Sequence, residues 1–279
     1  MSEVVADLRA FAAGAAKSVR VQRRYPFIFV GVLIWPLVLP GVFLLQAQGF
    51  SGGSASALSA FADRAGTRDV AGFLYVGGAA YMWLTGILGG PGNFLRAEQE
   101  QGTLEQVLLT PVSRVAFLLG PSLAELVPTL WTFGVVAAVL RLAFGVPFGP
   151  VEALRTLVVI LVATPALMGI GAIFGSAVLR FREVSGAIQI TRGVFQMLCG
   201  MTFPIAVLPG WARDVALALP PTYVLADVRA TLLAGEGLGS LLSDLGVLAA
   251  MGVVLCTVGV LLFQYAERQA RRRGTLGLY

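Results

Sequence analysis

Histidine is absent from the 279 residues, Lys17 is the only lysine, and only two cysteines, Cys199 and Cys256, are present. Without histidine the chain has no imidazole for general-base catalysis and no histidine ligand for a metal ion. The single lysine, in the N-terminal tail, leaves no other position for a Schiff base. Both cysteines fall in apolar runs, which favours small buried side chains over a disulfide. The sequence therefore carries little catalytic chemistry.

Charge is also scarce, since charged residues make up 13% of the chain and apolar residues 57%. These proportions are typical of a chain whose solvent is mostly lipid, and they predict an all-α integral membrane protein. The net charge of +5 does not indicate a nucleic-acid partner, because the basic residues lie at the ends of loops rather than on one face.

Long apolar runs predict six membrane spans. A helix needs about 18 to 20 apolar residues to cross about 30 Å of hydrocarbon. Runs of this kind extend over Phe27–Gln46, Val70–Gly90, Val115–Leu140, Leu154–Leu179, Val184–Leu208 and Leu241–Gln264. We expect one transmembrane domain over residues 1–279, with spans within 27–264, a tail at 1–26 and a basic tail at 265–279.

The basic residues predict the orientation of these spans. With both termini in the cytoplasm, 13 of the 20 lysine and arginine residues lie on the cytoplasmic side and six lie outside. Lysine and arginine are enriched in cytoplasmic loops of membrane proteins. We therefore expect a multi-pass protein of the cytoplasmic (inner) membrane with both termini inside.

Three shorter helices are predicted outside the spans. Apolar residues at steps of three and four before residue 26 predict an amphipathic helix on the inner leaflet, with a disordered basic tail as the alternative. The prolines and charges of residues 209–235 are costly in lipid, so this stretch is not a seventh span. It predicts two short helices, Trp211–Leu219 and Thr222–Leu233, which lie at the outer interface or re-enter the membrane.

A polar segment from Arg96 to Arg114 interrupts the apolar sequence between the second and third spans. Gly102 ends one helix, and Thr103 with Gln106 forms a capping box that starts another of about two turns, which stops before Pro111. The segment presents an apolar ridge formed by Leu104, Leu108 and Leu109. The carboxylates that flank this ridge belong to Glu98, Glu100 and Glu105. Such a surface fits a groove on a partner protein better than it fits a metal ion.

Two motifs resemble the membrane subunits of type-2 ATP-binding-cassette (ABC) exporters. The first is similar to the coupling-helix signature of that family and comprises Glu98, Glu100, Gly102, Thr103, Leu104 and Glu105, followed by Thr110-Pro111. The second is similar to the fifth span and outer helices of the family and comprises Phe203-Pro204, Pro209, Trp211, Leu219-Pro220, Thr222 and Arg229. The predicted layout of helices resembles the family over nearly the whole chain. The short first outer loop, about Ala47–Asp69, places the chain among the smaller exporters.

The resemblance implies a permease subunit that exports a drug, natural product, lipid or lipid-linked glycan. It implies a dimer of permeases, the same or different, bound to two separate nucleotide-binding ATPase subunits that hold ATP and magnesium. This chain has no G-x-x-x-x-G-K-[ST] motif of its own, so it needs no cofactor itself. The residues that would contact the ATPase are Glu98, Glu100, Gly102, Thr103, Leu104, Glu105 and Leu108.

Three residues within the spans are candidates for a substrate pathway: Glu125, Arg192 and Phe195. Glu125 lies near the bilayer centre, where an unpaired charge costs about 2.5 to 3.5 kcal/mol. It could contact a cationic or polar substrate. The alternative, which we favour from sequence alone, is an ion pair with Arg192 or hydrogen bonds to backbone loosened by Pro121 and Pro128. Gly86 with Gly90, and Gly171 with Gly175, have the spacing that lets helices approach closely.

Two other classes of function remain. A membrane-embedded enzyme acting on a lipid or isoprenoid would need clustered aspartates or a cysteine and histidine site, whereas the aspartates here are scattered. A passive channel or scaffold would not need the acidic docking segment between the second and third spans.

Overall fold

A computed structural model describes residues 2–51, 63–65, 67, 69–100, 102, 114–178 and 185–273. Every regular element in these ranges is helical, which confirms the all-α class. The elements are α1 (Ser2–Arg24), α2 (Phe27–Ser51), α4 (Val70–Glu100), α6 (Arg114–Ala124), α7 (Leu126–Ala143), α8 (Pro150–Val178), α9 (Ser185–Leu198), the 3₁₀ turn η1 (Ile205–Val207), α10 (Gly210–Leu217), α11 (Pro220–Leu232) and α12 (Leu242–Arg273).

Five helical segments of the described chain are long and apolar enough to cross a membrane. They are Phe29–Gln46, Asp63–Leu95, Leu119–Ala143, Pro150–Ala177 and Leu242–Gln269. The prediction of one continuous span over Val184–Leu208 is wrong, because α9 has 14 residues and ends at Leu198. A helix of that length covers roughly 21 Å, less than the hydrocarbon thickness. The chain then turns at Cys199 and Gly200, where the φ angle of Gly200 is +77°.

Several predicted elements are present. The N-terminal helix α1 and the two short helices α10 and α11 lie close to their predicted bounds. Gly102 follows the end of α4 and has a φ angle of +68°, a left-handed conformation that glycine adopts without a steric penalty. The predicted coupling helix after it lies outside the described residues.

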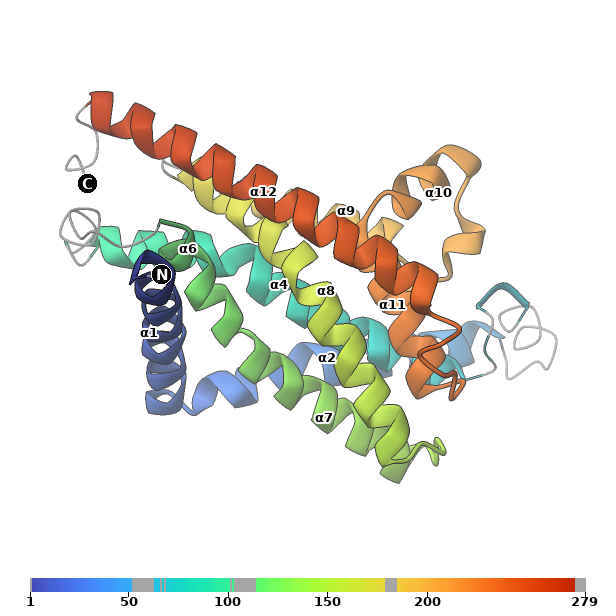
Figure 1. The fold of residues 1–279 in the computed structure, drawn as a ribbon. Helices are drawn as coiled ribbons and strands as arrows, with labels where there is room; N and C mark the ends of the chain where they lie inside the picture. The colour runs from blue at the N-terminus through green and yellow to red at the C-terminus, as the bar shows by residue number, and fades with distance from the viewer. Residues whose placement is uncertain are drawn as a thin grey trace.

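The two termini lie at the same end of the molecule. Figure 1 shows the N-terminus, the C-terminus and the last turns of α4 at one end of the molecule, and α10 and α11 at the other. Arg155 in the first turns of α8 donates a hydrogen bond to the carbonyl oxygen of Gly235 at 3.0 Å. This bond holds the start of α8 beside the loop that links α11 to α12.

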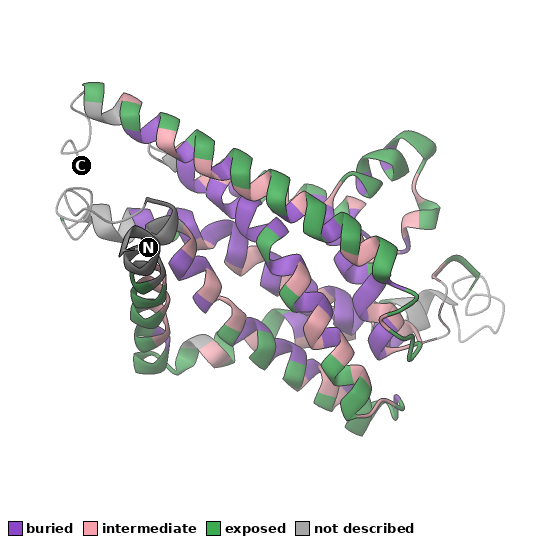
Figure 2. Cartoon of the chain, viewed as in Figure 1, coloured by how far each residue is buried: buried purple, intermediate pink, exposed green. Residues whose placement is uncertain are grey.

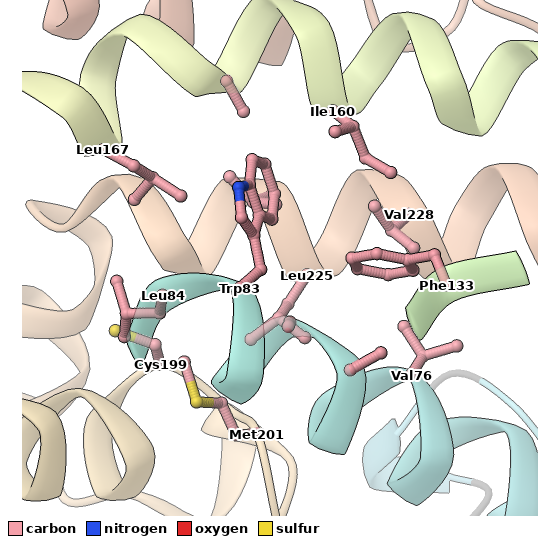
Figure 3. Packing of buried hydrophobic residues seen from close by; sticks show 14 of the residues in the cluster. Val76, Trp83, Leu84, Phe133, Ile160, Leu167, Cys199, Met201, Leu225 and Val228 are labelled. Carbon is pink, nitrogen blue, oxygen red and sulfur yellow. The ribbon is translucent and has the colours of Figure 1, made fainter. Parts of the chain in front are cut away.

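The core lies along α4 and α8, which occupy the middle of the bundle (Figure 2). Trp83 of α4 packs among apolar side chains from α7, α8 and α11, including Phe133, Leu167 and Leu225 (Figure 3). In contrast, α2 and α12 expose large apolar side chains such as Ile34 and Val253. Such faces are suited to contact with lipid or with another membrane-embedded subunit.

Prolines inside the helices free backbone carbonyl groups, because proline has no N–H to donate to the residue four positions earlier. Pro128 frees the carbonyl of Ala124, which accepts a hydrogen bond from Nε2 of Gln22 at 3.4 Å. The predicted third span is accordingly broken into α6 and α7, with Glu125 at the break. This hydrogen bond joins α1 to the break.

Candidate functional site

A cavity of about 470 Å³ lies between α1, α4, the junction of α6 and α7, and α9. Its polar lining includes two of the three residues predicted for a substrate pathway, Glu125 and Arg192. The other polar groups along its wall are Lys17, Ser18, Gln22, Thr85 and Asn93. A cavity of this size, largely apolar but with several polar side chains in its wall, is the strongest candidate for a binding site in the described chain.

Glu125 is positioned by the break between α6 and α7. Its backbone N–H donates to the carbonyl of Ser122 at 3.2 Å, which is a tighter turn than an α-helix makes. Its side chain lies against α4 at Gly86, where an added Cβ would come within 2.8 Å of Oε2 of Glu125. At Gly90 an added Cβ would lie 3.7 Å from Cγ of Glu125. This glycine pair therefore makes room for a side chain of the neighbouring helix.

Arg192 reaches the cavity from α9 and is held by neutral groups. Its Nη2 donates to the backbone carbonyl of Thr85 at 2.8 Å, and its Nη1 donates to Oε1 of Gln189 at 3.4 Å. The expected ion pair between Glu125 and Arg192 is not formed between these two described side chains. Nε of Arg192 has no partner in the described chain. No hydrogen bond or ion pair joins the Glu125 carboxylate to another described residue.

The N-terminal helix α1 forms one wall of the cavity. The ammonium group of Lys17 lies 5.6 Å from the centre of the Phe94 ring on α4, within the range of a cation–π interaction. Together with the hydrogen bond from Gln22 to Ala124, this contact holds α1 across both α4 and the broken helix. The amphipathic helix expected on the inner leaflet therefore also forms one side of the cavity.

Phe195, the third residue predicted for a substrate pathway, is not among the residues that line this cavity. Phe195 packs in the apolar core with 6% of its surface exposed. Glu98 and Glu100 belong to the last turn of α4, and Gly102 is exposed just beyond it. Thr103, Leu104, Glu105 and Leu108 lie outside the described residues, so their role in coupling stays a prediction.

A second polar centre lies around Arg229 of α11, which the sequence indicated only as part of a motif. The guanidinium group donates to the backbone carbonyls of Gly200, Phe73 and Met201 at 2.8, 2.9 and 3.4 Å. It also stacks on the Phe73 ring, with Cζ 3.4 Å from the ring centre. It therefore fastens α11 to α4 and to the turn that ends α9. Gly200 was the sequence signal that could have indicated this centre. A helix that ends there leaves backbone carbonyl groups without helical partners, and Arg229 can donate to them.

Asp227, two residues earlier on α11, is fully buried, and neither of its carboxylate oxygens has a hydrogen-bond partner in the described chain. Burial, with smaller contributions from Asp244 and Glu236, raises the pKa of Asp227 to about 7. A carboxyl group with this pKa is partly protonated near neutral pH, which lowers the cost of burying it without a cation.

The comparison with known families decides the class of the protein. The sequence profile of the ABC-2 type transporter family matches residues 11–233. The chain belongs to this family. This ABC-2 chain is therefore a membrane permease component, and the matched region includes α4, α6, α7 and α9 around the cavity. No protein of curated function matches the chain.

Proposed function

We propose that this ABC-2 chain is the permease subunit of an ATP-driven exporter for a drug, natural product, lipid or lipid-linked glycan. It acts as a dimer, and separate nucleotide-binding subunits supply the energy. The family match supports transport, and the cavity around Glu125 and Arg192 supplies a polar site within apolar helices. Ionisable residues within membrane helices are rare and costly, and they commonly mark functional sites such as substrate or ion pathways.

The position of the docking segment supports coupling to an ATPase. The segment between residues 101 and 113 connects the end of α4 to the start of α6, and both helices contribute to the cavity wall. The helical stretch from Arg114 to Glu125 is only about 16 Å long, so the end of the docking segment lies within that distance of the cavity. A partner that moves this segment would therefore shift α6 relative to α4 and change the width of the cavity. The contact residues of this proposal are Glu98, Glu100, Gly102, Thr103, Leu104, Glu105 and Leu108.

The same proposal places the chain in the cytoplasmic membrane with both termini inside. The excess of lysine and arginine on that side supports it, and so does the common end of the two termini in Figure 1. The docking segment then faces the compartment that contains ATP.

Reconstitution with a partner nucleotide-binding ATPase tests this function. Substrate-stimulated ATP hydrolysis should fall several-fold in Gly102→Val, because valine is strained at a φ of +68°, and in Leu104→Asp, which places a charge on the docking ridge. Gly237→Val is the control, since Gly237 lies in an exposed loop with no atom near its added Cβ. Wild-type stimulation in both docking variants, with normal membrane insertion, would contradict the coupling role.

A further inference from the structure

We infer that the cavity between α1, α4, the α6–α7 junction and α9 binds an amphiphile that carries a primary amine, with its ammonium group paired to Glu125. This inference names a substrate class for the proposed exporter and so rests on the proposed function for its transport step. The binding step depends only on the geometry of this chain.

The charges around the cavity favour a cationic ligand over an anionic one. Arg192 already donates to the carbonyl of Thr85 and to Gln189, and Lys17 already lies over the Phe94 ring. Nε of Arg192 has no partner in the described chain, but both Nη groups of this side chain are held. The Glu125 carboxylate, in contrast, has no hydrogen bond or ion pair at either oxygen among the described residues. An ammonium group would satisfy the carboxylate, whereas a phosphate or carboxylate ligand would be repelled by it.

The shape of the wall at Glu125 admits a compact headgroup. Gly86 and Gly90 leave the face of α4 without side chains opposite the carboxylate. Thr85 and Asn93 offer further polar atoms nearby, and the Phe94 ring lies on the same wall. A primary ammonium has three N–H donors, which match a carboxylate together with neighbouring amide or hydroxyl oxygens.

Apolar side chains of the cavity wall would contact the apolar part of the ligand. Val21 and Pro121 line the cavity beside the polar residues. Val21 lies on α1, which is expected at the inner leaflet, and about half of its surface (48%) is exposed. An alkyl chain could extend along α1 from the bilayer while its headgroup lies at Glu125. The ligand would then enter sideways from the inner leaflet.

Photolabelling of the permease–ATPase complex in lipid nanodiscs tests this inference. Three long-chain probes with the same diazirine carry a primary amine, an alcohol or a carboxylate, and labelled peptides are identified by mass spectrometry. The amine probe should label the peptides that contain Gly86–Phe94 and Pro121–Glu125 about tenfold more than the alcohol, since a charge-assisted pair is stronger than a neutral one. An excess of unlabelled alkylamine should remove this labelling.

Two variants connect the labelling to the carboxylate. Glu125→Gln keeps the shape of the side chain and should reduce amine labelling to the level of the alcohol probe. Gly86→Ala places a methyl group within 2.8 Å of Oε2 and should also reduce it, which provides a second test if Glu125→Gln does not fold. Glu152→Gln is the matched control, because Glu152 accepts a hydrogen bond from Gly149 at the far end of α8 and lies outside the cavity.

The outcomes separate this inference from the proposed function. Equal labelling by amine and alcohol, preferential labelling by the carboxylate probe, or unchanged amine labelling in both variants would overturn the amine site. Labelling that depends on Glu125, without any effect of alkylamines on ATP hydrolysis, would keep the site and contradict export of this class of substrate.

Discussion

At the scale of single residues, Arg192 and Arg229 are held by backbone carbonyl groups of neighbouring elements rather than by carboxylates of the described chain. Arg192 donates to Thr85 of α4, and Arg229 donates to three carbonyls on α4 and on the turn after α9. The five donors of a guanidinium group suit such clusters, since each carbonyl accepts from one N–H. Glu125 has no equivalent partners, and this difference makes it the unusual residue of the cavity.

Arg229→Lys tests how much of the fold depends on this arrangement. Lysine keeps the charge but cannot reach three carbonyls and stack on Phe73 at the same time, so we expect a loss of about 2 kcal/mol in the free energy of unfolding. Denaturant titration of the purified protein in detergent would measure it. Arg213→Lys, at an exposed position on α10, should change stability by less than about 0.5 kcal/mol. Equal stability of the two variants would contradict a fastening role for Arg229.

At the scale of elements, the sequence predicted those helices whose bounds are set by neighbouring residues in the chain. Helix α1 follows from apolar spacing and the end of α4 from Gly102. Helix α11 was predicted from Thr222, and it begins two residues earlier because Pro220 and Pro221 fit the first turn of a helix. The break at Glu125 and the short α9 were missed, because a hydropathy run does not distinguish a continuous helix from two pieces that both remain buried. The partners of Arg192 on α4 were also missed, and so was the lack of an ion pair at Glu125 among the described residues, since both depend on which helices become neighbours.

Gly171→Ala tests the close contact between α8 and α4. Pro91 frees the carbonyl of Ile87, and an added Cβ at Gly171 would lie 2.5 Å from that oxygen. The helices would have to separate, so we expect a loss of about 1 to 3 kcal/mol in unfolding free energy. Gly134→Ala on α7, where an added Cβ meets no atom within 4 Å, should not lose stability and should gain up to about 1 kcal/mol, because alanine favours a helix more than glycine does. A loss as large at Gly134 as at Gly171 would contradict the packing argument.

At the scale of the whole molecule, the number of crossings sets where the docking segment and the termini lie. Five segments of the described chain can span a membrane, and an odd number of crossings would place the two ends of the chain on opposite sides. Figure 1 instead shows both termini at one end, with α10 and α11 at the other. If both termini lie on one side of the membrane, a sixth passage is needed, and the short α9 with the turn that follows it is the candidate for it.

Single-cysteine labelling in cells distinguishes these topologies. In a variant with Cys199 and Cys256 replaced by alanine, cysteines at Arg20 and Arg272 should react with a membrane-impermeant maleimide only after permeabilisation. A cysteine at Gly237, in the exposed loop between α11 and α12, should react in intact cells. Reaction of Arg20→Cys and Arg272→Cys from opposite sides would establish five crossings. Reaction of both cysteines from outside would show that the orientation is the reverse of the predicted one. The docking segment would then lie on the side away from any cytoplasmic ATPase, so the mechanism of coupling depends on this result.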